Sequence, residues 1–396
     1  MNKVLNDKKI MEYGIYLFIV VLFWGDTTSF KFLGLYIPAI FFFLRITLTK
    51  RVYRFWKCPL FIAIILFSIS GILSTIWAVN TLESLIFFEK NILRLILIYV
   101  IIVSVFDDKK RFSRLLYVIA LTSILYLFVS YSIYFQEFIS LGYIRRLANT
   151  ELRNASWPLV YLLPFVVLRV VNAKDEYSKM FWIMAICLSV ISLVLSGQRG
   201  PVAGLVGITC VWFVYARNTA RFAIIVGIII CVGSIFMFAS DFPVIKEYSR
   251  GVFSSGRVFL YETYMNVFKD NYWLGVGIDN KAMFDAARGK GMVILEQGPH
   301  NSFLTVAVKQ GLIGVISYIL LLLTCIFSII WKIKRLPFTW YKAIGIALLS
   351  CFIGMYIFKG LTNDMVMMPL AILIGITSAY LKMKVRDYEY DVSPQN

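Results

Sequence analysis

Residues 303–331 read FLTVAVKQGLIGVISYILLLLTCIFSIIW, an almost unbroken apolar run with one charged side chain, Lys309. A helix needs about 20 predominantly apolar residues to cross a bilayer, so this run can span a membrane. Comparable runs recur along all 396 residues, of which 60% are hydrophobic and 16% charged, with a mean hydropathy of +0.78. About a quarter of the residues in a soluble domain are charged. The composition therefore excludes a soluble globular enzyme and predicts an all-α polytopic membrane protein.

The apolar runs predict about twelve transmembrane helices in a single integral membrane domain, residues 1–396. These helices are expected near residues 12–25, 31–48, 59–79, 84–106, 113–135, 157–172, 180–197, 201–216, 221–239, 303–331, 340–358 and 365–383. We find no internal sequence repeat that would divide the chain further.

Basic residues are distributed unevenly over the loops between these runs. When the loops are assigned alternately to two sides, 24 of the 40 Lys and Arg residues fall on one side and 14 on the other, while Lys90 and Arg94 lie inside the fourth run. Short cytoplasmic loops carry the excess of basic residues, so both termini, which lie on the richer side, are predicted to be cytoplasmic. The net charge of +18 then reflects these loops and does not indicate nucleic-acid binding.

One outer loop is too long to be a simple connection. It covers residues 240–302, between the ninth and tenth predicted helices, and loops of this length are usually functional. The sequence SSG at residues 254–256 is typical of a helix start, and a second short helix is expected near residues 281–291. The apolar stripe of the first helix, expected to lie on the membrane core, is Val258, Tyr261, Met265 and Phe268.

The only histidine of the chain, His300, ends this loop in the sequence GPHNS. Pro299 suits the start of a helix, which would place His300 in the first helical turn, at the outer interface. Histidine is the usual general base near neutral pH. The alternative interpretation is an interfacial or capping residue without a chemical role.

Arginines on the outer side are exceptions to the predicted charge pattern. Arg145, Arg146 and Arg153 lie in one outer loop, and Arg199 lies in the tight turn SGQRG. Arg257 stands at the predicted start of the loop helix, where free backbone N–H groups and the helix dipole favour an anion. A single arginine of this kind can simply reach lipid headgroups, but several together indicate a bound anion.

The sequence lacks the motifs of several other kinds of enzyme chemistry. We find no D-x-D pattern for a metal-bound nucleotide sugar, no phosphate-binding loop and no zinc-protease or serine-hydrolase motif, so no metal and no cofactor are expected. Gly275 and Gly277 form half of a dinucleotide motif and are interpreted as a turn. Glu89, Lys90 and Arg94 have a spacing that permits pairing within one helix, an arrangement that is structural here but that a transporter would also offer.

Three segments together resemble the O-antigen ligase family of bacterial lipopolysaccharide assembly, which is related to O-antigen polymerases and O-linked oligosaccharyltransferases. The turn SGQRG resembles the family's arginine in a short periplasmic turn, and SGRVFLYE, residues 255–262, resembles its arginine at the start of a periplasmic helix. His300-Asn301, followed after nine residues by GLIG at 311–314, is similar to the ligase signature H-[NSQ]-x9-G-x-x-G.

The resemblance implies a GT-C-type glycosyltransferase in the bacterial inner membrane with a periplasmic active site. Its donor would be a preassembled glycan on undecaprenyl diphosphate, and its acceptor would be a sugar hydroxyl of lipid A-core. Membrane lipids would surround the protein. With no metal, arginines would neutralise the leaving diphosphate. The residues expected in catalysis are His300, Arg199 and Arg257, and those expected to bind substrate are Arg146, Arg153, Asn301 and Glu262.

Two other functions stay open at this point. An O-antigen polymerase would use the same donor and similar arginines but extend the glycan on its lipid carrier, and the spacing that follows His300 favours the ligase. A transporter or flippase of lipid-linked sugars would explain the helices and the arginines without catalysis, although it would more often show repeated halves. The oligomeric state, the glycan and the acceptor sugar are not defined by the sequence.

Overall fold

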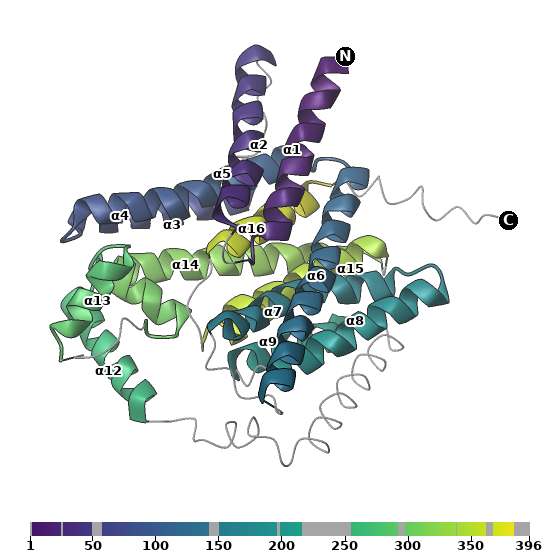
Figure 1. Cartoon of the computed structure of the whole chain (residues 1–396). Helices are drawn as coiled ribbons and strands as arrows, with labels where there is room; N and C mark the ends of the chain where they lie inside the picture. The colour runs from purple at the N-terminus through teal and green to yellow at the C-terminus, as the bar shows by residue number, and fades with distance from the viewer. Residues whose placement is uncertain are drawn as a thin grey trace.

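The computed structural model of the chain describes residues 2–24, 27–49, 58–141, 150–195, 199–215, 255–291, 298–337, 339–361 and 367–383. Within these ranges the chain is helical and contains no strand (Figure 1). By length and composition, six helical segments in the described part can cross a membrane, and three shorter apolar helices accompany them. These features support the predicted polytopic membrane protein. The count of twelve stays a prediction, since its ninth member, 221–239, lies outside the described residues.

The helices follow the predicted apolar runs closely. Those of the first half are α1 (Asn2–Val21), α2 (Thr28–Thr49), α3 (Pro59–Trp77), α4 (Thr81–Phe88), the π-helix η2 (Glu89–Leu93), α5 (Arg94–Val105), α6 (Lys109–Leu141), α7 (Thr150–Val171), α8 (Glu176–Leu195) and α9 (Arg199–Tyr215). Those of the second half are α12 (Ser255–Asp270), α13 (Asn280–Arg288), α14 (Ser302–Arg335), α15 (Trp340–Cys351), the π-helix η3 (Phe352–Phe358) and α16 (Met367–Lys382).

The helix α16 forms the centre of the bundle (Figure 1). Every residue from Pro369 to Tyr380 is buried, as expected for a helix that is apolar on all sides. The ammonium group of Lys332, near the end of α14, donates hydrogen bonds to backbone carbonyls at the end of α16, among them that of Met383 at 3.1 Å. A cation is favourable there because the carbonyl end of a helix carries partial negative charge.

Side-chain contacts join loops that were assigned to the same side of the bundle. Lys8 of α1 forms an ion pair with Asp107 at 2.8 Å, and the ammonium group of Lys109 lies 6.0 Å from the centre of the Trp340 ring. All four residues belong to loops or helix ends assigned to the basic side. The contacts therefore support the alternating arrangement of the helices, while the cytoplasmic position of both termini stays a prediction.

The predicted pairing inside the fourth apolar run is formed across a π-helical turn. Arg94 donates hydrogen bonds to the Glu89 carboxylate at 3.3 Å, and the Tyr36 hydroxyl of α2 donates to the same carboxylate at 3.2 Å. A π-helix has more residues per turn than an α-helix, so residues five apart come onto one face. The Arg94 guanidinium also lies 5.1 Å from the centre of the Phe32 ring. This cluster joins α2 to η2, in agreement with a structural role.

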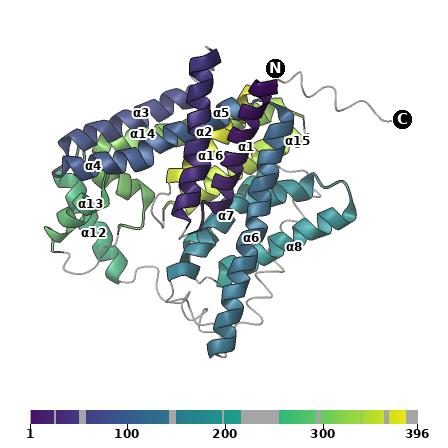
Figure 2. The ribbon, with the colours of Figure 1, turned by 45° about the horizontal axis from the view of Figure 1, so that its top comes forward.

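The long outer loop contains both predicted helices, but the buried face of the first one was predicted only in part, since Tyr261 and Phe268 of the predicted stripe pack on a core whereas its other two residues do not. Val258 and Met265 of α12 are exposed, whereas Tyr264 and Val267 are buried. The buried side chains belong to a small separate core formed with α13 and the start of α14, not with the membrane core: Val276, Met283, Ala287, Leu304, Ala307 and Val308. Since α12 has apolar residues on two sides, only its packing partners decide which side is covered. Both views show α12 and α13 together beside the start of α14 (Figures 1 and 2).

The helix α14 is broken at Gly311, where the sequence predicted a continuous span. The backbone there has φ 65° and ψ −164°, a conformation that is open to glycine and costly for residues with a side chain. The preceding loop pairs with the backbone at the break: Leu312 N donates to Tyr272 O at 2.7 Å and Val276 N to Val308 O at 2.9 Å. Backbone groups inside a membrane protein must be paired internally, so this loop is what permits the break.

The predicted turn at Gly275 and Gly277 is confirmed and lies against the break. Both glycines have positive φ, 72° and 119°, and a side chain on Gly275 would overlap the backbone of Lys309. On the other side α3 holds the same segment, because Ser74 donates a hydrogen bond to Lys309 O at 2.5 Å and Ser70 donates to Gln310 Oε1 at 2.8 Å. The GLIG motif therefore marks a helix break that is enclosed by two other elements.

Replacement of Gly311 by Ala is expected to destabilise the fold more than the same change at Gly291. Both glycines have positive φ, 65° and 89°, so both variants carry backbone strain of about 1–3 kcal/mol. A methyl group at Gly311 would also overlap the Trp273 carbonyl, whereas no atom of the described residues lies within 4 Å of one at Gly291. Thermal unfolding of the purified variants in detergent measures the difference. Equal losses would show that the break is not packed against the loop.

Candidate active site

His300 has a strained backbone at the entrance of α14. Among the residues that the structure describes, it is the only non-glycine residue with a positive φ, 51°. Histidine is one of the residue types that tolerate this region, yet it still costs about 1–3 kcal/mol and such strain concentrates at functional sites. The imidazole is partly exposed. The backbone conformation therefore favours a functional interpretation of this residue.

The cap of α14 is Asn301, not His300. The Asn301 Oδ1 atom accepts hydrogen bonds from Phe303 N at 3.0 Å and Leu304 N at 3.1 Å, and its Nδ2 atom donates to Leu361 O at 3.3 Å. The helix begins at Ser302, so His300 precedes the first turn rather than lying in it as predicted. The capping alternative for His300 does not hold, because Asn is a preferred cap and occupies that position. The side chain of Asn301 thus positions the helix and its neighbour, His300.

The start of α14 is fixed against the segment that follows η3. Ser302 N donates a hydrogen bond to Gly360 O at 2.8 Å. Beside it lies Lys359, which is only 3% exposed, with its ammonium group 5.8 Å from the centre of the Trp157 ring of α7. The sequence interpretation missed Lys359. The property that singled out the arginines also applies to Lys359, because it is a basic residue in an outer loop, on the side predicted to be poor in Lys and Arg.

Arg199 is the first residue of α9, and this helix packs closely on η3. A methyl group on Gly204 would lie 3.0 Å from Gly354 O, and one on Gly207 would lie 3.1 Å from Gly354 Cα. Small residues of this kind let two helix backbones approach each other in membranes. The helix that Arg199 begins is therefore joined through η3 to the His300 segment.

Arg257 lies in the first turn of α12, which confirms the predicted helix start. Its helix contacts the first half of α14 through Tyr264 and Leu304. Arg153 lies in the first turn of α7, one turn before Trp157. Of the helices that carry these arginines, α12 packs on α14, while α7 and α9 pack on α15 and η3.

The positions of the arginine side chains are not part of the described structure. For Arg153, Arg199 and Arg257 it describes the backbone alone, and Arg146 lies outside the described residues. A common binding site for their guanidinium groups therefore stays a prediction.

Two carboxylates of the long loop differ in their availability. Asp279 is buried and caps α13, with one oxygen accepting from Ala282 N at 2.7 Å and the other from the Ser84 hydroxyl of α4 at 2.5 Å. Glu262 lies on the exposed side of α12. Nearby, a hydrogen bond from Lys281 to Glu83 at 3.0 Å raises the pKa of the lysine and ties α13 to α4. Of the two loop carboxylates, only Glu262 can readily meet a ligand.

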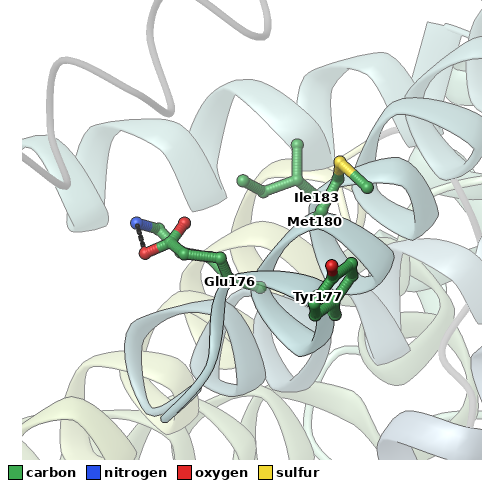
Figure 3. Close-up of a pocket in the computed structure, with 5 residues that line it drawn as sticks. Glu176, Tyr177, Met180 and Ile183 are labelled. Atoms are coloured by element: carbon green, nitrogen blue, oxygen red, sulfur yellow. Dashed lines mark hydrogen bonds and ion pairs between the residues drawn. The ribbon is translucent and has the colours of Figure 1, made fainter.

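The described residues contain no candidate metal centre, and the pocket on α8 is separate from the predicted site residues. In the described ranges, no three His, Cys, Asp or Glu side chains are grouped so that they could hold a metal ion. The pocket is lined by residues of α8 alone, among them Tyr177, Met180 and Ile183, and contains the ion pair of Lys179 and Glu176 at 3.4 Å (Figure 3). None of the predicted site residues lies in it.

Residues 183–319 match the family model of O-antigen ligase. This O-antigen ligase region begins within α8 and ends within α14, so it contains Arg199, Arg257, His300 and the break at Gly311. The resemblance of the sequence to the O-antigen ligase family is therefore confirmed. A comparison with curated protein sequences gives no match.

Proposed function

We propose that this chain is a membrane-embedded glycosyltransferase of the GT-C type that acts as an O-antigen ligase. The donor is a preassembled glycan on undecaprenyl diphosphate, and the acceptor is a sugar hydroxyl of lipid A-core at the periplasmic face of the bacterial inner membrane. The observation that carries this proposal is His300, the only imidazole of the chain, held in strained backbone at the start of α14, the helix on which the Arg257-bearing α12 packs. The family match supports the reaction class.

The chemistry follows from these residues. The acceptor hydroxyl oxygen attacks the anomeric carbon of the donor glycan, and the bond between that carbon and the diphosphate oxygen breaks. His300 takes the hydroxyl proton as general base. Undecaprenyl diphosphate leaves with the bonding electron pair, and Arg199 and Arg257 neutralise its charge beside the N–H groups of two helix starts. The diphosphate linkage supplies the driving force, so neither a nucleotide nor a metal ion is required.

The remaining predicted residues have supporting roles in this proposal. Asn301 holds the backbone of His300 through the helix cap, and Glu262 faces the acceptor from the exposed side of α12. Arg146 and Arg153 bind the donor from the loop and first turn of α7. The whole chain is one membrane domain, with residues 240–302 as its periplasmic loop and both termini in the cytoplasm.

Reconstituted transfer with defined substrates tests the proposal. The purified chain is mixed with lipid-linked glycan and lipid A-core in excess chelator, and both lipids are analysed by gel and mass spectrometry. We expect full-length glycan attached to core, because arginines replace a metal at the leaving group. Activity that is lost with EDTA and restored by magnesium or manganese would contradict this mechanism.

The same assay separates the alternatives. A polymerase would lengthen the lipid-linked glycan and leave the core unmodified. A transporter or flippase would leave both substrates covalently unchanged while moving the donor across a vesicle membrane. Either outcome would overturn the ligase proposal.

A further inference from the structure

Tyr272 and Trp273 form an exposed aromatic pair in the turn after α12. Their side chains are 42% and 64% exposed, and their ring centres lie 5.3 Å apart with the planes nearly perpendicular. Phe268 of α12 contacts Tyr272 with ring centres 5.2 Å apart. The pair is therefore attached to the small core of the outer loop, while Trp273 stays mostly exposed and Tyr272 partly so.

The backbone of this pair is bound to α14 directly beyond the helix break. The carbonyls of Tyr272 and Trp273 accept hydrogen bonds from Leu312 N at 2.7 Å and Ile313 N at 3.4 Å. These are the first residues after Gly311, whose N–H groups lack a regular helical partner because of the break. The backbone that carries the two rings is consequently bound to the N-terminal end of the long second half of α14.

One face of that second half is exposed and apolar along its whole length. Its members follow at a spacing of three or four residues: Ile313, Ile316, Leu320, Leu323, Phe327 and Trp331. From the first to the last of them the helix rises about 27 Å, close to the roughly 30 Å of a bilayer hydrocarbon core. An apolar face of this length without a packing partner is typical of contact with lipid.

Aromatic residues lie at both ends of this lipid-facing stripe. Trp331 lies at the inner end of the stripe, and the Arg335 guanidinium lies 3.5 Å from the centre of the Trp331 ring. At its outer end, the backbone of Tyr272 and Trp273 is hydrogen-bonded to Leu312 and Ile313. Tryptophan and tyrosine are enriched at both membrane interfaces because their rings have an apolar body and a polar edge.

We propose that Tyr272 and Trp273 insert into the outer headgroup region of the bilayer and anchor the unit of α12 and α13 to the membrane. The anchor fixes the height of α12, and so of Arg257, relative to substrates that are themselves held in the membrane by lipid chains. Contact with lipid does not depend on catalysis, so this inference can fail while the proposed function holds, and the reverse is also true.

Quenching of tryptophan fluorescence by brominated lipids tests the anchor. The full chain is placed in bilayer nanodiscs whose lipids carry bromine either near the headgroup end or near the methyl end of the acyl chain. The emission lost in Trp273→Phe is the contribution of Trp273. We expect this contribution to be quenched more strongly by the shallow bromines than by the deep ones.

Two matched variants calibrate the measurement. The Trp331→Phe variant removes the tryptophan at the other end of the stripe, which is 57% exposed, and its contribution should be quenched with the same depth preference. The Trp212→Phe variant removes a fully buried tryptophan, whose contribution should change little.

A Trp273 contribution that is insensitive to both lipids but quenched by aqueous iodide would overturn the proposal. So would a Trp273 emission that shifts only when glycan is added, since the pair would then be a sugar-stacking platform.

Discussion

Replacement of His300 by Asn is expected to lower turnover by ~10²–10⁴-fold, the usual contribution of a general base. Asparagine tolerates a left-handed backbone, so the variant can keep the φ of 51° found at this position. What it loses is the nitrogen that accepts the proton of the acceptor hydroxyl. Initial rates of glycan transfer, measured at equal amounts of folded protein, give the effect, and binding of the lipid-linked donor should be unchanged.

The pH dependence separates a base from a structural residue. An imidazole that has taken up a proton has no free lone pair with which to act as a base. The wild-type rate should therefore fall towards acidic pH, and this limb should be absent from the residual activity of His300→Asn. The variant His300→Gly, which relieves the backbone strain as well, should show the same loss. Near-normal turnover of His300→Asn with the wild-type acid limb would exclude His300 and indicate a carboxylate such as Glu262.

Replacement of both Arg199 and Arg257 by Ala is expected to remove nearly all transfer while the chain still folds. A hydrogen bond to a charged group contributes roughly 1.5–3 kcal/mol, so losing two of them should slow the reaction by roughly 10²–10⁴-fold. Lysine at the same positions should restore only part of the rate, because a point charge lacks the two-pronged geometry of a guanidinium. The measurement is the rate of transfer at saturating donor and acceptor.

Arg288 provides the matched control for this pair. It belongs to the same long loop as Arg257, is exposed, and forms an ion pair with Asp285 at 2.9 Å within α13. The Arg288→Ala variant removes one positive charge from the outer face without touching the start of any helix at the site, so its rate should stay near that of the wild type. If the double variant at Arg199 and Arg257 is fully active, these arginines take no part in stabilising the leaving group.

Much of this protein follows from local properties of the sequence. The apolar helices could be predicted because a run of about 20 apolar residues favours a helix that can cross a membrane. The start of α12, the helix α13 and the turn at Gly275 depend on a few neighbouring residues, and all three were predicted. His300 was found because it is the only histidine and precedes a helix, and the position of Arg257 in the first turn of α12 followed from the three residues before it.

Only the tertiary structure decided how these parts meet. Gly311 lies inside an apolar run that is helical on both sides, and the helix breaks there because a loop almost 40 residues earlier supplies partners for the freed backbone groups. The buried face of α12 is chosen by α13 and α14, and Lys359 reaches the site because η3 ends beside Ser302. Local patterns determine whether a segment is a helix, but its breaks, faces and neighbours depend on hydrogen bonds and packing between residues far apart in the chain.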